Sequence, residues 1–343
     1  MSTVDGSCGA AAAAITISSL FMSSPFLVGT MIVCAIPTLF WFTCYLLPQI
    51  YMCVRPVPNL KKKYITTNTS TGKEDWALVT GAGSGIGKAI AMKCAAQQLN
   101  VVLVSLDDEF LKTTMKEIQS LYPKQQFRAI GVNFTRNTNY MDMIQQQTKD
   151  ISITIIFNNA GFIVTGFVDQ VPIEKLLMNI ECNAVAAMQI SHFFVQKLIQ
   201  QKKKGCIVFT SSVAAYIPSP FAAMYSATKA FISTLACSMH IECAPLGIDV
   251  IAIHPSPVAS NFYNKLDHKV NLIEAAAKNA ALPDHIVNDI FRSVGSGCAL
   301  RDLGTMAWCT RIVTFFIPLN TFVMMFTLAA PYLPDWKTHN KHR

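Results

Sequence analysis

Short apolar runs of strand length recur through the middle of the chain. They cover residues 76–80, 101–105, 127–132, 151–157, 206–210 and 248–253. Segments long enough for helices separate these runs, and such an alternation is typical of a parallel sheet with helices packed on its faces. The sequence therefore predicts a single doubly wound parallel-sheet α/β domain, in which the carboxyl ends of the strands lie along one edge.

A longer pattern, with apolar residues three and four positions apart, extends from Pro172 to Lys202 and predicts one long helix. Asn183 lies in the middle of this pattern among small residues. Because asparagine is unfavourable inside a helix, we expect Asn183 to have a specific role. The alternative is a buried asparagine whose amide is satisfied by backbone groups.

The N-terminal part of the chain has no charged side chain between Asp5 and Arg55. Within it, residues 26–47 are long and apolar enough to cross about 30 Å of hydrocarbon as a helix. Basic residues follow at Arg55 and 61–63, so the positive-inside rule places the downstream domain in the cytoplasm. Two prolines, Pro37 and Pro48, leave a kinked or re-entrant segment open.

A second uncharged stretch of spanning length covers residues 312–333 and contains Pro318. Basic residues flank both of its ends, so its orientation stays open. It could span the membrane, lie in the interface, or form an apolar entrance for a lipid. The predicted organisation is a tail (1–25), a transmembrane anchor (26–54), a linker (55–74), a catalytic domain (75–295) and a hydrophobic C-terminal segment (296–343).

Composition agrees with membrane contact. The 343 residues are 52% hydrophobic and 14% charged, whereas soluble domains average about 45–50% and about 25%. The net charge of +8 comes mostly from scattered basic residues, so a nucleic-acid partner is not indicated. The eleven cysteines form no CxxC pair. They indicate reduced thiols in a protein that faces the cytosol, without a metal site.

A glycine-rich turn follows the first apolar run, in the sequence Thr80-Gly-Ala-Gly-Ser-Gly-Ile-Gly87. A helical pattern follows the turn. Glycines allow the backbone to turn tightly and to approach a pyrophosphate, and the N-terminus of the next helix offers amide donors. A flexible loop without a ligand is the alternative.

Residues 225–229 begin a segment compatible with a helix, in which Tyr225 and Lys229 would lie on one face because they are four positions apart. A free phenol titrates near pH ~10, so a nearby ammonium would make it a better proton donor at neutral pH. Ser212, at the end of the preceding apolar run, could hydrogen-bond the same substrate oxygen. These three residues predict carbonyl reduction, or alcohol oxidation in reverse, although a chance Tyr-Lys pair is the alternative for the spacing alone.

Taken together, Thr80 to Gly87, Asn158-Asn159-Ala160-Gly161, Asn183, Ser212, Tyr225 and Lys229 resemble the motifs of the short-chain dehydrogenase/reductase family. The resemblance covers residues 75–262 and implies a Rossmann domain that binds NAD(H) or NADP(H). It implies that Ser212, Tyr225 and Lys229 are catalytic, and that Asn183 holds a water that links Lys229 to solvent. The implied cofactor contacts are Gly81, Gly83, Ser84, Gly85, Ile86, Gly87, Asp107, Asn133, Asn159, Ala160, Gly161, Tyr225, Lys229, Val258 and Ser260.

The usual markers of cofactor preference are missing. Leu106 stands where NADP users of the family often have arginine, and Ser105 where NAD users often have aspartate. Asp107 would repel a 2′-phosphate if it turned inward, but it could also belong to the cap of the next helix. NADP(H) is the predicted cofactor, and NAD(H) is not excluded.

A further departure concerns the loop after residue 253. Related proteins hold the nicotinamide there with a Pro-Gly-Pro-Val-x-Thr sequence, in which this chain has Ser256 for the glycine and Ser260 for the threonine. Ser256 places the loop geometry in question, because glycine tolerates left-handed backbone better.

The anchor and the Tyr-Lys site together resemble the branch of very-long-chain 3-oxoacyl-CoA reductases and hydroxysteroid dehydrogenases of the endoplasmic reticulum membrane. That resemblance implies reduction of a lipophilic 3-oxoacyl-CoA in fatty acid elongation, with the catalytic domain facing the cytoplasm. A steroid or retinoid dehydrogenase and a non-catalytic cofactor-binding scaffold are the alternatives. The sequence leaves the oligomeric state open, with a homodimer among the options.

Overall fold

The computed structural model describes residues 25–65, 74–263, 270–271, 274–275 and 280–340. The chain divides into two units, the first ending at Val54 and the second beginning at Arg55. In the first unit, helix α2 (Pro25–Val54) continues through both Pro37 and Pro48. It is the one described helix that is long and apolar enough to cross a membrane by itself.

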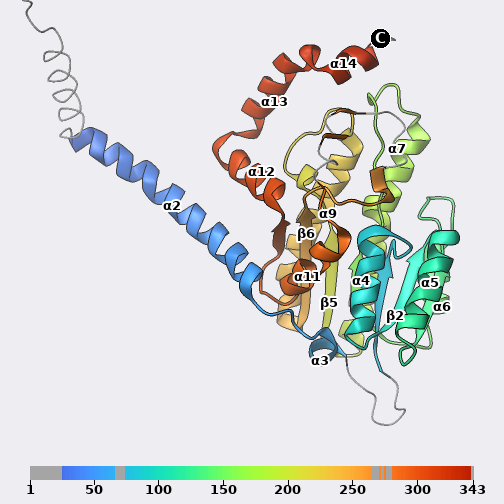
Figure 1. Cartoon of the computed structure of the whole chain (residues 1–343). Coiled ribbons are helices and arrows are strands. Elements are labelled where there is room, and N and C mark those ends of the chain that lie inside the picture. Colours follow the sequence, from blue (N-terminus) through green and yellow to red (C-terminus); the bar gives the residue numbers. More distant parts are fainter. Residues whose placement is uncertain (1–24, 66–73, 264–269, 272–273, 276–279, 341–343) are drawn as a thin grey trace, which may run out of the picture. The chain divides into compact units, whose positions relative to one another are not determined.

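In the second unit, seven described strands form one parallel sheet in the order β3-β2-β1-β4-β5-β6-β7 (Figure 1). The order runs outward from β1 in both directions, as in a doubly wound fold. The predicted α/β fold is therefore confirmed, and the first six strands match the six apolar runs. Their bounds are β1 (Trp76–Thr80), β2 (Asn100–Ser105), β3 (Phe127–Gly131), β4 (Ile153–Asn158), β5 (Gly205–Thr210), β6 (Ile248–Pro255) and β7 (Leu300–Leu303).

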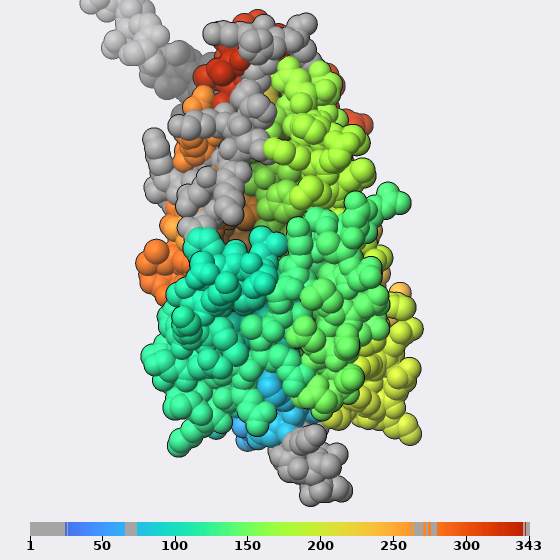
Figure 2. All heavy atoms as spheres, turned by 90° about the vertical axis from the view of Figure 1, so that its right-hand side faces the viewer, coloured from blue at the N-terminus to red at the C-terminus, as the bar shows by residue number. Residues whose placement is uncertain are grey.

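Helices cover both faces of the sheet. On one face, α4 (Gly85–Ala96), α5 (Glu109–Leu121) and α11 (Pro283–Ser293) pack against the strands, and on the other α6 (Tyr140–Gln147), α8 (Ala186–Gln200) and α9 (Ala223–Cys243) do so. In Figure 2 the teal-to-green surface belongs to the segment that carries α5 and α6, and the lime surface beside it to the segment that carries α7 (Ile173–Ile180).

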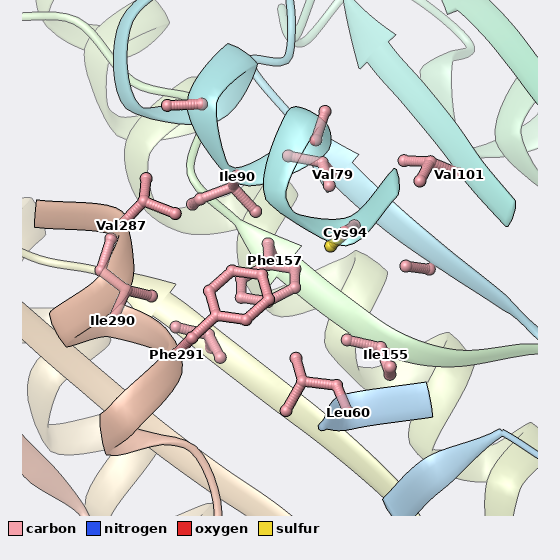
Figure 3. Packing of buried hydrophobic residues seen from close by; sticks show 14 of the residues in the cluster. Leu60, Val79, Ile90, Cys94, Val101, Ile155, Phe157, Val287, Ile290 and Phe291 are labelled. Carbon is pink, nitrogen blue, oxygen red and sulfur yellow. The ribbon is translucent and has the colours of Figure 1, made fainter. Parts of the chain in front are cut away.

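The core on the α4 side is built from alternate strand residues and the inner faces of the helices. Phe157 of β4 stacks on Phe291 of α11 with ring centres 5.6 Å apart. Ile90 and Cys94 of α4 lie in the same fully buried cluster (Figure 3). Burying these side chains holds the helices on the sheet and fixes where the carboxyl ends of the strands meet.

Part of the segment assigned to a linker packs on the domain. Residues Leu60–Tyr64 form the short helix α3, whose N-terminus is capped by the Asn59 side chain accepting from the Lys62 N–H at 2.9 Å. Leu60 and Tyr64 are buried in the core of the α4 side. The domain therefore begins before residue 75, while residues 66–73 lie outside the described part of the chain.

The seventh strand corrects the predicted C-terminal limit of the domain at residue 295. β7 pairs in parallel with β6 from Ala252↔Leu300 to Pro255↔Leu303. Its residues Arg301 and Asp302 are charged but at least 98% buried, and this charge is why an apolar-run search misses the strand. The catalytic domain therefore includes residues that the sequence assigned to the hydrophobic C-terminal segment.

The apolar stretch 312–333 does not form one straight helix. It is divided between α12 (Thr305–Phe316), α13 (Leu319–Ala329) and the 3-10 turn Ala330–Tyr332, followed by α14 (Pro334–His339). The helices on either side of Ile317 and Pro318 are bent by 106°. Proline cannot donate the helical hydrogen bond, so the break falls where Pro318 stands.

Candidate active site

The glycine turn joins β1 to α4 in a conformation that requires glycine. Gly81 and Gly85 have φ values of +67° and +55°, a region that side chains with a Cβ avoid. A Cβ on Gly87 would lie 2.1 Å from the carbonyl oxygen of Gly81. Ser84 precedes the first turn of α4, with Ile86 inside that turn. The turn thus presents open backbone and a helix N-terminus, which fits a pyrophosphate.

The loop after β4 lies against this turn. The Thr80 hydroxyl accepts hydrogen bonds from the N–H groups of Asn159 at 2.9 Å and Ala160 at 3.0 Å. A Cβ on Gly81 would lie 2.9 Å from the Cα of Ala160. The sequence motifs at residues 80–87 and 158–161 therefore meet at the carboxyl edge of the sheet, as predicted for a parallel arrangement.

Ser212, Tyr225 and Lys229 converge at the same edge. Ser212 follows β5, and its hydroxyl lies close enough to the Tyr225 phenol to lower the pKa of that phenol. The Lys229 ammonium lies 5.6 Å from the centre of the Tyr225 ring and donates to the Thr210 carbonyl at 2.8 Å. The Tyr-Lys spacing is therefore realised on one face of α9, with the serine hydroxyl beside the phenol.

Asn183 lies in a π-helical turn (Glu181–Val185) between α7 and α8. Its side-chain oxygen accepts from the Phe162 N–H at 2.9 Å, and its amide donates to the Phe162 carbonyl at 2.9 Å. π-turns inside α-helices are frequent at functional sites. Here the turn places Asn183 where its amide holds the loop that follows Gly161.

Gly161 shows how closely these groups approach one another. A Cβ on Gly161 would lie 3.0 Å from Asn183 Oδ1 and 3.4 Å from Lys229 Nζ. Asn183 and Lys229 are therefore neighbours across this glycine. The water that Asn183 is predicted to hold, linking Lys229 to solvent, stays a prediction.

The electrostatics of the pair differ from the expectation that Lys229 makes Tyr225 more acidic. Burial raises the pKa of Tyr225 above its ordinary value of 10.0, and the nearby Ser212 hydroxyl only partly opposes this. Burial also lowers the pKa of Lys229 from 10.5 to about 8. Desolvation is the largest cause of both shifts, and Tyr225 is protonated at neutral pH, as a proton donor must be.

These values predict an alkaline limit to carbonyl reduction. Above a pH of about 8, Lys229 loses its proton, and the positive charge beside Tyr225 disappears. We expect kcat/KM to be flat from pH 6 to 8 and to fall about tenfold for each further pH unit. Initial rates measured across this range would check it. The Lys229→Arg variant keeps its charge to higher pH, so a limb that persists in this variant would contradict the assignment.

The loop after β6 reaches both the glycine turn and the C-terminal helices. Val258 is buried, and a Cβ on Gly85 would lie 3.0 Å from the Cβ of Ser260. Ser256 is not among the residues with positive φ, so the serine needs no glycine-like backbone. Its hydroxyl instead accepts from the Ala307 N–H at 3.1 Å and thereby caps the first turn of α12.

The residues expected to select the cofactor are at the end of β2 and β3. Asp107 and Asn133 are exposed, and Asp107 packs close to Gly131. Asp108 caps α5 by accepting from the Leu111 N–H at 3.0 Å, as the alternative interpretation predicted for this pair of aspartates. A Cβ on Gly83 would lie 3.0 Å from the Ser105 hydroxyl, so no charged group is placed at that contact.

Several residues near the site were missed by sequence reasoning. The aromatic ring of Phe262 lies 5.8 Å from that of Tyr225, and Phe221, just before α9, has a φ of +63°. Left-handed phenylalanine is unusual, and no sequence signal marks it. Phe221 packs near Phe167, which in turn contacts Trp336 of α14 at 5.1 Å between ring centres. The C-terminal segment thus contributes to the surroundings of the site.

A comparison with known protein families agrees with this arrangement of residues. Residues 75–271, more than half of the chain, match the family described as short chain dehydrogenase. The chain therefore belongs to the short-chain dehydrogenase family, as the sequence motifs indicated.

Two relatives show which enzymes of this family the chain is similar to. A very-long-chain 3-oxoacyl-CoA reductase of Ajellomyces capsulatus is 29% identical over 66% of this chain and 66% of its own length. A 17-beta-hydroxysteroid dehydrogenase type 3 of Mus musculus is 32% identical over 57% of this chain and 64% of its own length. The chain thus matches somewhat less than two thirds of each relative.

The fold is also that of solved structures. A short-chain dehydrogenase from Sphingobium yanoikuyae in complex with NADPH superposes with a TM-score of 0.62 and 23% identity. The superposition covers 71% of this chain and 93% of the other. At this identity the likeness concerns the fold.

Proposed function

We propose that the protein is a membrane-bound oxidoreductase that reduces a carbonyl group of a lipophilic substrate with NADPH. The convergence of Ser212, Tyr225 and Lys229 beside the glycine turn is the observation that carries this proposal. A phenol, a hydroxyl and a buried ammonium at one point supply a proton donor and polar partners for a substrate oxygen.

The residues present fit a dinucleotide. The turn at Gly81, Gly85 and Gly87 has no room for side chains, so backbone amides would face the pyrophosphate. Ser260 lies against Gly85, and Val258 is buried in the same loop, so this loop would hold the nicotinamide end. Asp107 is exposed and packs on Gly131. NADPH, when bound, supplies the hydride.

The protein's own groups would complete the reaction. Ser212 would donate a hydrogen bond to the substrate oxygen, and Tyr225 would deliver the proton to that oxygen as it becomes negative. Lys229 would hold its positive charge nearby and contact the ribose. Asn183 would fix the loop of Phe162 that borders the site.

A 3-oxoacyl-CoA is the substrate class we favour. The relatives named very-long-chain 3-oxoacyl-CoA reductases support it, and the ring of Phe262, 5.8 Å from that of Tyr225, offers an apolar contact for an acyl chain. A hydroxysteroid is the second candidate, supported by the similarity to the mouse dehydrogenase.

The membrane is the second proposed partner. Helix α2 is long enough to span it. By contrast, α12 has 12 residues, a length of about 18 Å, and is followed by the 106° bend. The α12–α13 pair exposes large apolar side chains such as Phe316, Leu319, Met324 and Leu328. We infer that this pair lies within one leaflet beside the active site.

An assay in detergent tests the proposed function. Full-length protein is incubated with NADPH or NADH and a panel of 3-oxoacyl-CoA, steroid and retinoid carbonyls, and the nicotinamide absorbance is followed. We expect the highest kcat/KM with NADPH and a long-chain 3-oxoacyl-CoA. Preference for a steroid would favour the second candidate. The absence of turnover with every carbonyl would favour a non-catalytic scaffold.

The proposed endoplasmic reticulum location and orientation can be tested separately. Asn68, in the sequence Asn68-Thr69-Ser70, is a potential N-glycosylation site. If the catalytic domain faces the cytoplasm, Asn68 stays unmodified when the protein is expressed in microsomes. A mobility shift that is reversed by endoglycosidase would place the domain in the lumen, and a sequon engineered before residue 25 serves as the luminal control.

A further inference from the structure

A second cluster of buried polar side chains lies behind the catalytic helix. It contains Ser211, just after β5, and Ser233, His254 and Asp302, which belong to α9, β6 and β7; all four are buried. None of these residues belongs to the catalytic set. A polar cluster in such a position is costly unless its members satisfy one another.

The cluster is bonded directly to the backbone of Lys229. The Ser211 hydroxyl contacts the Lys229 carbonyl oxygen at 2.9 Å, and the Ser233 hydroxyl contacts the same oxygen at 2.7 Å. The two hydroxyls are 2.7 Å apart. Ser211 also precedes Ser212 in the chain, so the serine pair joins the strand end carrying Ser212 to the helical turn carrying Lys229.

The next link is formed by His254. Its Nε2 lies 2.9 Å from the Ser233 hydroxyl, and its Nδ1 lies 3.5 Å from Asp302 Oδ1, a contact that does not make a hydrogen bond. Burial lowers the pKa of His254 to about 4, so the ring is neutral at physiological pH. The Ser233 hydroxyl has a single proton, which it donates to the Lys229 carbonyl. At its contact with His254 it therefore accepts from the Nε2–H, so the neutral ring carries its proton at Nε2.

Asp302, His254 and Ser233 follow one another in space as the residues of a hydrolytic triad do. Their surroundings, however, exclude a role in hydrolysis. The Ser233 hydroxyl points at the Lys229 carbonyl inside the protein, and Ser233 is only 8% exposed. A nucleophile needs a substrate carbon within reach. The arrangement is therefore suited to positioning.

Asp302 also connects the cluster to helix α12. The Arg311 Nε donates to Asp302 Oδ2 at 3.3 Å, and the Trp308 indole donates to the Asp302 carbonyl at 3.0 Å. The Tyr216 hydroxyl donates to Asp302 Oδ1. The Arg311 guanidinium stacks 3.7 Å from the centre of the Tyr216 ring. One carboxylate thus joins the apolar C-terminal helix to the core.

We propose that Asp302, His254 and Ser233 are positioning residues that fix the turn of α9 bearing Lys229 and connect it to helix α12. The proposal rests on the proposed function, because it assigns these residues to the same catalytic site. It also implies that the position of α12 against the core affects the geometry of that site.

Two substitutions and their combination test the proposal. Ser233→Ala removes the hydroxyl between His254 and Lys229, and Asp302→Asn removes the carboxylate without changing its size. We expect each to lower kcat about tenfold while the Kd for NADPH stays within twofold. Because both act through one chain of contacts, the double variant should lose no more than the stronger single variant. Effects that multiply would overturn the proposal.

Ser293→Ala is the matched control. Ser293 is buried on α11, and its hydroxyl donates to the carbonyl four residues earlier, at Asp289, at 2.6 Å. The local bond is the same as that of Ser233, but within the described part of the chain the Ser293 hydroxyl bonds inside α11 and not to the catalytic helix. We expect its kcat to stay within twofold of wild type. A Ser233→Ala enzyme as active as Ser293→Ala would overturn the proposal.

A readout without turnover separates this proposal from the proposed function. Full-length protein with labelled lysine side chains is titrated by NMR in detergent, and the Lys229 signal is assigned by its loss in Lys229→Met. We expect Ser233→Ala to move the Lys229 titration midpoint by at least half a pH unit, and Ser293→Ala to leave it unchanged. Absence of turnover in wild type would end the proposed function. An unmoved midpoint in Ser233→Ala would end the positioning role.

Discussion

Replacement of Tyr225 by phenylalanine should lower kcat for carbonyl reduction by roughly 10²–10⁴. The ring keeps its packing beside Phe262, but the phenol that would deliver the proton is lost. Burial holds the pKa of this phenol above its usual value, so at pH 7 the wild-type enzyme has the proton available in every molecule. The variant should bind NADPH as tightly as wild type.

Stopped-flow and steady-state measurements of NADPH oxidation, with binding followed by nicotinamide fluorescence, check this result. Tyr122→Phe is the control, since Tyr122 lies at the end of α5 and takes no part in the proposed chemistry. Equal rates for Tyr225→Phe and wild type, with both active, would remove Tyr225 from the mechanism.

The second large effect concerns Lys229→Met, which should abolish activity without destabilising the protein. Loss of the ammonium removes the charge beside Tyr225, for which we expect a decrease in kcat of at least about 10². Lys229 is 3% exposed, and the lowering of its pKa from 10.5 to about 8 corresponds to a cost on the order of 3 kcal/mol at pH 7. Loss of the hydrogen bond from Lys229 to the Thr210 carbonyl offsets no more than about the same free energy as this desolvation cost.

The pH dependence of the free energy of unfolding shows whether Lys229→Met stabilises or destabilises the protein. Folding lowers the pKa of Lys229. The charged side chain therefore destabilises the folded wild-type protein below a pH of about 8, and this destabilisation disappears as the pH rises towards 10.5. The free energy of unfolding of Lys229→Met should therefore equal or exceed that of wild type at pH 7, with the difference changing above pH 8. The exposed Lys149, changed to Met, is the control. A clear loss of stability in Lys229→Met alone would contradict the assigned burial cost.

Most of the sheet could be predicted from the sequence, because its central strands are buried on both faces. Strands such as β1 and β4 are fully buried along their length, so selection for apolar residues leaves a continuous run. The edge strand β7 could not be predicted in this way. Its buried Asp302 is acceptable inside the protein because Tyr216 and Arg311 reach its carboxylate, and Tyr216 is distant in sequence.

The candidate site also has features that could be predicted from the sequence and features that could not. The order of the glycine turn, Ser212, Tyr225 and Lys229 was sufficient to predict which residues meet, since parallel strands bring their carboxyl ends to one edge. The balance between burial and charge attraction at Tyr225 was not predictable, because desolvation depends on how much protein surrounds each group. The role of Ser256 was equally hidden, since the helix that it caps begins almost fifty residues later.

The parallel pairing of β6 with β7 matters for anyone who shortens the chain to obtain a version that does not need detergent. Ending it at residue 295 would remove Leu300–Leu303, leave the backbone of β6 as an open edge, and deprive Ser256 of the helix that it caps. Open edges recruit other strands, so such a fragment should aggregate. A stop after Phe316 keeps β7 and α12 while discarding α13 and its exposed apolar side chains.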